Sequence, residues 1–152
     1  MSAPFIIPFN NQPVATVPKS GAGYTVPAGK YARVSGAISV TVMPSQAAAA
    51  TVSNGAMGAN SGNQVLSFSF WLKAGDVITL NQVEATNSGT ISVGTAVTVS
   101  GVSTASILVN SVDVARVHAT GSISYSGNIA SSYAFTGTTT VNYLCEEYYI
   151  IS

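Results

Sequence analysis

The chain has 152 residues, a length that suits one domain with a real core. Only 7% of its residues are charged, the formal net charge is zero, and the five basic residues are scattered. Nucleic acid binds clustered positive charge, so this composition excludes a nucleic-acid partner. It also leaves sheet edges without the charges that usually prevent pairing with other chains, and therefore favours a protein that assembles.

Residues 1–23 contain four prolines, which we expect to prevent a continuous sheet ladder. We therefore predict an extended N-terminal arm, followed by one domain over residues 24–152. The arm lacks a basic segment and prolines interrupt it, so we expect neither a signal peptide nor a membrane span there. Its large apolar side chains either dock on a neighbouring subunit or cover their own domain's core: Phe5, Ile6, Ile7 and Phe9.

The composition predicts strands, because Val, Ile and Thr total 44 residues whereas Leu and Met total 8. The clearest strand covers residues 31–42, where apolar residues occupy the even positions and mostly polar residues the odd ones. Before it, residues 26–29 predict a type I turn with Pro27 second and Gly29 fourth. Residues 44–63, rich in Ser, Asn and Gly, predict a long flexible loop.

A second strand is predicted over residues 64–72, with Trp71 on the face opposite Phe68 and Phe70. Residues 73–76 then predict a tight turn, with Gly75 at the position that needs a positive φ. Residues 77–83 continue as a strand, so we expect a hairpin over residues 64–83.

Further short strands are expected over residues 91–99, 105–109, 112–118, 123–125, 133–136 and 140–151. Glycines punctuate this part of the chain, and we expect them to separate the strands: Gly89, Gly101, Gly121, Gly127 and Gly137. Many short strands with regular turn signals are typical of a sandwich or jelly roll. The predicted fold is therefore all-β, a sandwich or jelly-roll-like domain with an N-terminal arm.

Nucleophilic catalysis needs a nucleophile, a base and usually an orienting acid. Only His118, Cys145 and Asp113 could supply them, and nothing in their spacing supports a triad. Cys145, on the face of Val141 and Tyr143, is expected to be a buried, inert thiol. As the single cysteine it forms no intrachain disulfide, which suits synthesis in a reducing cytoplasm.

The acidic residues do not form a catalytic or metal-binding pair in the sequence. Asp76 lies in a turn, where Asp is ordinary. Glu146 and Glu147 are adjacent, so in a strand they face opposite sides, and we expect them to solvate the end of the chain. No ligand spacing for a metal or cofactor is present. We therefore predict no enzyme, no catalytic residue, no metal and no cofactor.

Two aromatic features favour binding or assembly. Trp71 is expected to point to solvent, to a second packed layer or to a partner. The run Tyr148-Tyr149-Ile150-Ile151 must bury one face, within the domain or between subunits. The candidate interface residues are therefore Trp71, Tyr148 and Tyr149, together with the apolar residues of the arm.

The stretches YTVPAGKYARVSGAISV (24–40) and FWLKAGDVITL (70–80) resemble small β-rich virion proteins of tailed bacteriophages, namely capsid decoration, head-fibre and fibre modules. The second stretch is also similar to the Gly-Asp turn of trimeric jelly rolls of the tumour-necrosis-factor and complement-C1q type. There the turn lies near the C-terminus, whereas here it lies mid-chain. The resemblance implies a jelly-roll-like homotrimer on a virion, and it assigns no functional residue.

We therefore expect a virion structural protein, a capsid decoration (cement) or head-fibre protein made in the host cytoplasm. Its partners would be further copies of itself and the major capsid or another virion protein, with no nucleic acid and no membrane. The alternative is a fibre-tip module that binds a receptor or glycan through Trp71 and some of the seven tyrosines. A third class, an enzyme, would need a polar cleft around His118.

Overall fold

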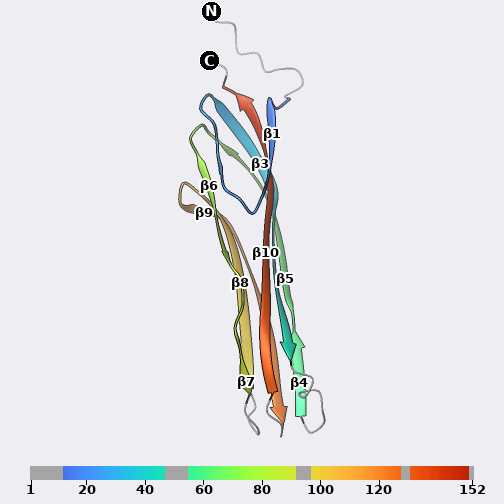
Figure 1. Cartoon of the computed structure of the whole chain (residues 1–152). Coiled ribbons are helices and arrows are strands. Elements are labelled where there is room, and N and C mark those ends of the chain that lie inside the picture. Colours follow the sequence, from blue (N-terminus) through green and yellow to red (C-terminus); the bar gives the residue numbers. More distant parts are fainter. Residues whose placement is uncertain (1–11, 47–54, 92–96, 128–130, 151–152) are drawn as a thin grey trace, which may run out of the picture.

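The computed structural model describes residues 12–46, 55–91, 97–127 and 131–150, and within these ranges it contains ten β-strands and no helix. The strands form two antiparallel sheets around a shared apolar core, so the predicted all-β sandwich is confirmed. The sandwich is long and narrow, and its strands run along its length (Figure 1). None of the described segments forms a helix able to cross a membrane.

The first sheet has the strand order β1-β10-β3-β5. These strands are β1 (Ala15–Ser20), β3 (Lys30–Gln46), β5 (Gly62–Leu72) and β10 (Ser131–Tyr149). β10 and β3 pair over most of their length, from Tyr133 to Tyr149. The other edge of β10 pairs with the short strand β7 (Ser88–Ile91) near its start and with β1 near its end.

The second sheet has the order β2-β6-β8-β9-β4. Its strands are β2 (Tyr24–Thr25), β4 (Gly55–Asn60), β6 (Val77–Val83), β8 (Val97–Val109) and β9 (Val112–Gly127). A two-residue turn joins β8 to β9, and both Asn110 and Ser111 have positive φ, as the tightest hairpin turns require.

The core lies between the sheets and follows the alternation read from the sequence. The even positions of β3 face inwards, and the odd positions of β10 meet them from the neighbouring strand. Fully buried side chains come from both sheets: Val34, Ile38, Val40, Ile107, Ile123, Val141 and Cys145. The predicted strand over residues 31–42 is therefore confirmed.

The expected separation of strands at glycines is wrong for the later part of the chain. Gly101, Gly121 and Gly137 lie inside β8, β9 and β10, which are longer than predicted. A Cβ on Gly121 would lie 2.8 Å from Cγ1 of Val42, and one on Gly101 would lie 2.8 Å from Cγ of Phe135. These residues are glycines because the sheets pack closely there. The expected strand over residues 91–99 is also wrong, since Ile91 ends β7 and Val97 begins β8 in the other sheet.

The predicted hairpin over residues 64–83 is wrong, although its turn is correct. The N–H of Asp76 donates to the carbonyl of Lys73 at 3.1 Å, and Gly75 has a φ of 87°. However, β5 pairs with β3 in the first sheet, whereas β6 pairs with β2 and β8 in the second. The turn carries the chain across the sandwich, which allows both Leu72 and Ile78 to be buried in the core.

The predicted loop over residues 44–63 is largely strand in its described part. β3 continues to Gln46 against β10, β4 pairs with β9, and β5 begins at Gly62. Long partner strands hold these polar residues in the ladder, so composition alone misleads here. The four-alanine run lies in residues 47–54, outside the described residues.

Part of the predicted N-terminal arm belongs to the sandwich. Residues 15–20 form β1 and pair with β10, so the expected break in the ladder is wrong for this stretch. The N–H of Gly21 donates to the carbonyl of Val141 at 2.8 Å, and bonding residues alternate, so Pro18 faces away from β10. An edge strand tolerates proline in that position. Phe5, Ile6, Ile7 and Phe9 lie outside the described residues.

The predicted turn at residues 26–29 is displaced by one position. The N–H of Lys30 donates to the carbonyl of Pro27 at 3.2 Å, and Gly29 has a φ of 78°. Pro27 is therefore the first residue of the turn and Gly29 the third, the position where a type II turn needs a positive φ.

Candidate functional site

Three aromatic side chains gather on the outer face of the first sheet, near the end of the sandwich that carries the turns at residues 27–30 and 73–76. Tyr31 of β3 pairs with Tyr148 of β10 in the ladder, and the ring of Trp71 of β5 contacts both, with its centroid 5.9 Å from that of Tyr148. The ring centroid of Tyr31 is 5.3 Å from that of Tyr148 and 5.8 Å from that of Trp71. Trp71 is 60% exposed, so the predicted outward orientation is confirmed. We call Tyr31, Trp71 and Tyr148 the aromatic patch.

The two turns beside the aromatic patch are hydrogen-bonded to each other. The N–H of Gly75 donates to the carbonyl of Val26, and the N–H of Val26 donates to the carbonyl of Asp76, each at 3.0 Å. The two stretches that carry the resemblance to virion proteins therefore form one structural unit at this end of the sandwich.

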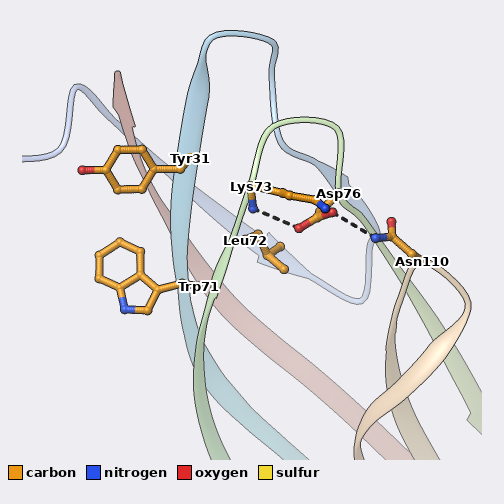
Figure 2. A pocket seen from close by; sticks show the side chains of 6 residues that line it. All are labelled: Tyr31, Trp71, Leu72, Lys73, Asp76 and Asn110. Carbon is orange, nitrogen blue, oxygen red and sulfur yellow. Dashed lines mark hydrogen bonds between the residues drawn. The ribbon is translucent and has the colours of Figure 1, made fainter. Parts of the chain in front are cut away.

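The buried side chain of Asp76 holds this unit together through hydrogen bonds. Its carboxylate accepts from the side-chain amide of Asn110 and from the backbone N–H of Lys73, each at 2.9 Å (Figure 2). These two hydrogen bonds, that of Asn110 first, lower the pKa of Asp76 below its ordinary value because they stabilise the charged form. Asp76 is therefore a structural acid that remains ionised at neutral pH.

A hollow of about 660 Å³ adjoins the patch, lined by Tyr31, Trp71, Leu72, Lys73, Asp76 and Asn110. Figure 2 shows the rings of Tyr31 and Trp71 one above the other at its side, with the Lys73–Asp76 turn opposite. Exposed aromatic faces beside a few polar groups are suited to stacking on a sugar ring or anchoring a protein partner.

A second feature of this end is a buried carboxylate that the sequence analysis missed. Glu147 is 4% exposed, accepts a hydrogen bond from the phenol of Tyr24 at 2.6 Å and forms an ion pair with Lys30 at 3.0 Å. The expectation that both glutamates solvate the chain end is therefore wrong for Glu147. The available signal was its spacing of two from Cys145, which places both on the inward face.

The opposed orientation of the two glutamates is as predicted. Glu146 lies on the outer face, half-buried, with an oxygen 3.9 Å from Arg33. Tyr149, the third candidate interface residue besides Trp71 and Tyr148, is exposed and lies apart from the patch contacts, with its ring 5.4 Å from the Lys30 ammonium. In the run Tyr148-Tyr149-Ile150-Ile151, Tyr148 is half-buried, Tyr149 and Ile150 are exposed, and Ile151 lies outside the described residues, so the expected burial of one face stays a prediction.

The residues considered for catalysis are not brought together. Cys145 is fully buried on the inward face of β10, as predicted, and burial raises the pKa of its thiol to about 12. His118 and Asp113 are exposed on β9, in the other sheet. Among the described residues, no group of three or more His, Cys, Asp or Glu side chains could hold a metal ion.

A groove runs along one side of the sandwich, between unpaired strand edges. Among the described strands, β5 pairs only with β3, and residues 112–121 of β9 pair only with β8. Hollows of about 590 and 420 Å³ lie between them, lined mainly by residues 64–72 of β5 and 114–118 of β9. We call this the seam groove. At its closed end, a Cβ on Gly62 would strike the backbone of Thr120.

Comparison with known proteins assigns no family. The scan against protein-family descriptions finds no match, and the searches of curated proteins and of solved structures find none either.

Proposed function

We propose that this chain is a structural protein of a virion, a capsid decoration or head-fibre protein that acts by self-association and has no catalytic role. Its partners would be further copies of itself, in a trimer, and the major capsid or another virion protein. It would be made in the host cytoplasm and reside on the particle. A jelly-roll-like trimeric arrangement, with no nucleic acid or membrane as partner, belongs to the same proposal.

The seam groove is the observation that carries this proposal. It combines two strand edges that are unpaired among the described strands with exposed apolar side chains, among them Val65 at 62% and Val114 at 49%. Residues 64–72 contain no charged side chain that would oppose pairing with another chain. Exposed edges of this kind favour burial against a further subunit.

Two further observations support a role on a particle. The two stretches similar to phage virion proteins are joined by the hydrogen bonds between Val26 and the Gly75-Asp76 turn. The sandwich is narrow and its long antiparallel strands run along its length, a shape suited to a projecting or clamping subunit (Figure 1).

The proposal is tested by the native mass and by the location of the protein. Light scattering after size exclusion should give a stable oligomer at micromolar concentration. Mass spectrometry of purified particles from the phage that encodes the chain should find it as a stoichiometric component. A monomer that is absent from such particles would overturn the proposal.

A second function, binding of a receptor glycan, is favoured by the aromatic patch and the hollow beside it. Exposed Trp71 offers a stacking surface, and Lys73 lies at the adjoining hollow. On a glycan array, Trp71→Ala should abolish binding, whereas Tyr149→Ala, which removes an equally exposed ring outside the patch, should retain it. An array without any signal for the unaltered chain would remove this alternative.

A further inference from the structure

We propose that the seam groove is filled by residues 5–9 of a second copy of the chain, added as a strand along the free edge of β5. The inference rests on the proposed self-association and specifies which surfaces meet. In the added segment, the apolar side chains of Phe5, Ile7 and Phe9 would face the groove. Each copy of the chain would insert its own segment into a neighbour's groove and accept one in its own.

The groove presents both the hydrogen-bonding groups and the apolar surface that an added strand needs. The outer edge of β5 has no partner among the described strands, and its backbone N–H and C=O groups can therefore pair with an added strand. Phe68 and Phe70 stack with their ring centroids 5.7 Å apart on the inward face but remain only partly buried. Leu66 is 38% exposed beside them. The described chain therefore leaves an apolar strip at this edge uncovered.

The prolines of the N-terminal segment fit a strand that bonds along one edge only. In an extended strand, successive residues direct their N–H and C=O groups to opposite edges. In such a strand, Pro4, Ile6 and Pro8 would direct their backbone groups to one edge. Phe5, Ile7 and Phe9 would direct theirs to the other edge, where each of the three has a backbone N–H to donate. β1 already uses this arrangement, since Pro18 faces away from β10. The proline edge would also stop further strands from adding.

Charge is compatible with this occupant. Residues 1–11 contain no charged side chain, and neither do residues 64–72; the charged residues that line the groove, Asp76 and Arg116, both lie outside β5. Burying the segment against β5 would therefore desolvate no charged side chain of either stretch. Phe5, Ile7 and Phe9 would together bring a large apolar area to the strip formed by Phe68 and Phe70.

The length of chain favours a second copy over the chain's own groove. Val14 is held against β10, since its N–H donates to the carbonyl of Glu147 at 2.7 Å. Phe9 is five residues earlier, a reach of at most about 18 Å. The chain's own groove lies beyond β5, about four strand spacings from β1, or roughly 19 Å, and the segment would have to bend around the sheet to reach it. Exchange between copies has no such restriction.

The test uses full-length chains with one altered side of the contact. Ile7→Asp should place a charge in the groove and weaken self-association at least about tenfold. Ile6→Asp, on the opposite face of the same segment, is the matched control. On the receiving side, Leu66→Asp should have the effect of Ile7→Asp. Asn63→Asp is its control, because Asn63 is an exposed residue of β5 that does not line the groove. Circular dichroism and thermal unfolding establish that each variant is folded.

Mixing the two defective variants then tests exchange directly. Ile7→Asp keeps an intact groove, and Leu66→Asp keeps an intact segment, so an equimolar mixture should form a heterodimer although each variant alone is monomeric by light scattering. A mixture that stays monomeric would overturn exchange between copies, as would normal assembly of both variants. If the unaltered chain itself is monomeric, the proposed self-association fails first, and the two failures are thereby distinguished.

Discussion

The phenol of Tyr24 donates a hydrogen bond of 2.6 Å to the carboxylate of Glu147, 123 residues later in the chain. Lys30 contacts the other carboxylate oxygen at 3.0 Å. This buried cluster ties the short edge strand β2 and the start of β3 to the end of β10. It therefore holds together the end of the sandwich that carries the aromatic patch.

Acid should weaken the protein through Glu147. The hydrogen bond from Tyr24 is the main cause that lowers its pKa, Lys30 adds to it, and burial opposes both. A carboxylate whose pKa is lower folded than unfolded stabilises the fold above the unfolded value, and this stability is lost as pH falls through the folded value. Urea unfolding from pH 7 down to about pH 3 should show the loss below the ordinary value of 4.5.

The control for this pH dependence is the neighbouring glutamate. Glu147→Gln should make the acid limb of the stability profile shallower, leaving the contribution of Asp76, whereas Glu146→Gln, on the outer face, should leave the limb unchanged. Tyr24→Phe removes one hydrogen bond to a charged group and should lower the free energy of unfolding by about 1.5–3 kcal/mol at neutral pH. An identical acid limb in all three variants would contradict this assignment.

The thiol of Cys145 should be inert in the folded protein. It is fully buried, and burial raises its pKa to about 12, so almost no thiolate is present or reachable at neutral pH. A thiol-specific chromogenic reagent should therefore react only after denaturant is added, at a rate limited by unfolding. Rapid stoichiometric reaction in native buffer would show that β10 is not packed as described.

Gly137→Ala should destabilise the protein although Gly137 lies in a strand, where alanine is ordinarily the better residue. A methyl group there would strike the hydroxyl of Ser103 and the backbone of Ala85 and Glu84, so the sheets would have to separate locally. The expected loss is about 1–3 kcal/mol in the free energy of unfolding. The exposed neighbour Thr138→Ala should change it by less than about 0.5 kcal/mol.

Trp71 provides a direct optical report on assembly, because it is the single tryptophan of the chain and is 60% exposed. In dilute solution its fluorescence should be typical of a hydrated indole and readily quenched by acrylamide. If the aromatic patch is buried on assembly, concentration should shift the emission to shorter wavelength and reduce quenching. A shift without a change in mass would instead report a local rearrangement around Tyr31.

Composition and period-two patterning together predicted the all-β class, and the patterning predicted the β3 strand, the outward Trp71 and the buried Cys145. These follow from the sequence because a strand alternates its faces and each face meets one solvent environment. The tight turn at Gly75 was equally local, since a positive φ selects glycine. The sequence could not show whether Gly121 marks a turn or a close packing of sheets, because both demand a residue without a side chain.

Which strands pair was decided only in three dimensions. A turn such as Lys73–Asp76 can close a hairpin or cross between sheets, and the choice depends on where distant strands β3 and β8 offer their edges. The burial of Glu147 likewise required Tyr24 and Lys30 to arrive from the other end of the chain. Alternation along one strand is a local property of the sequence, whereas the seam groove and the aromatic patch arise from pairing between residues far apart in it.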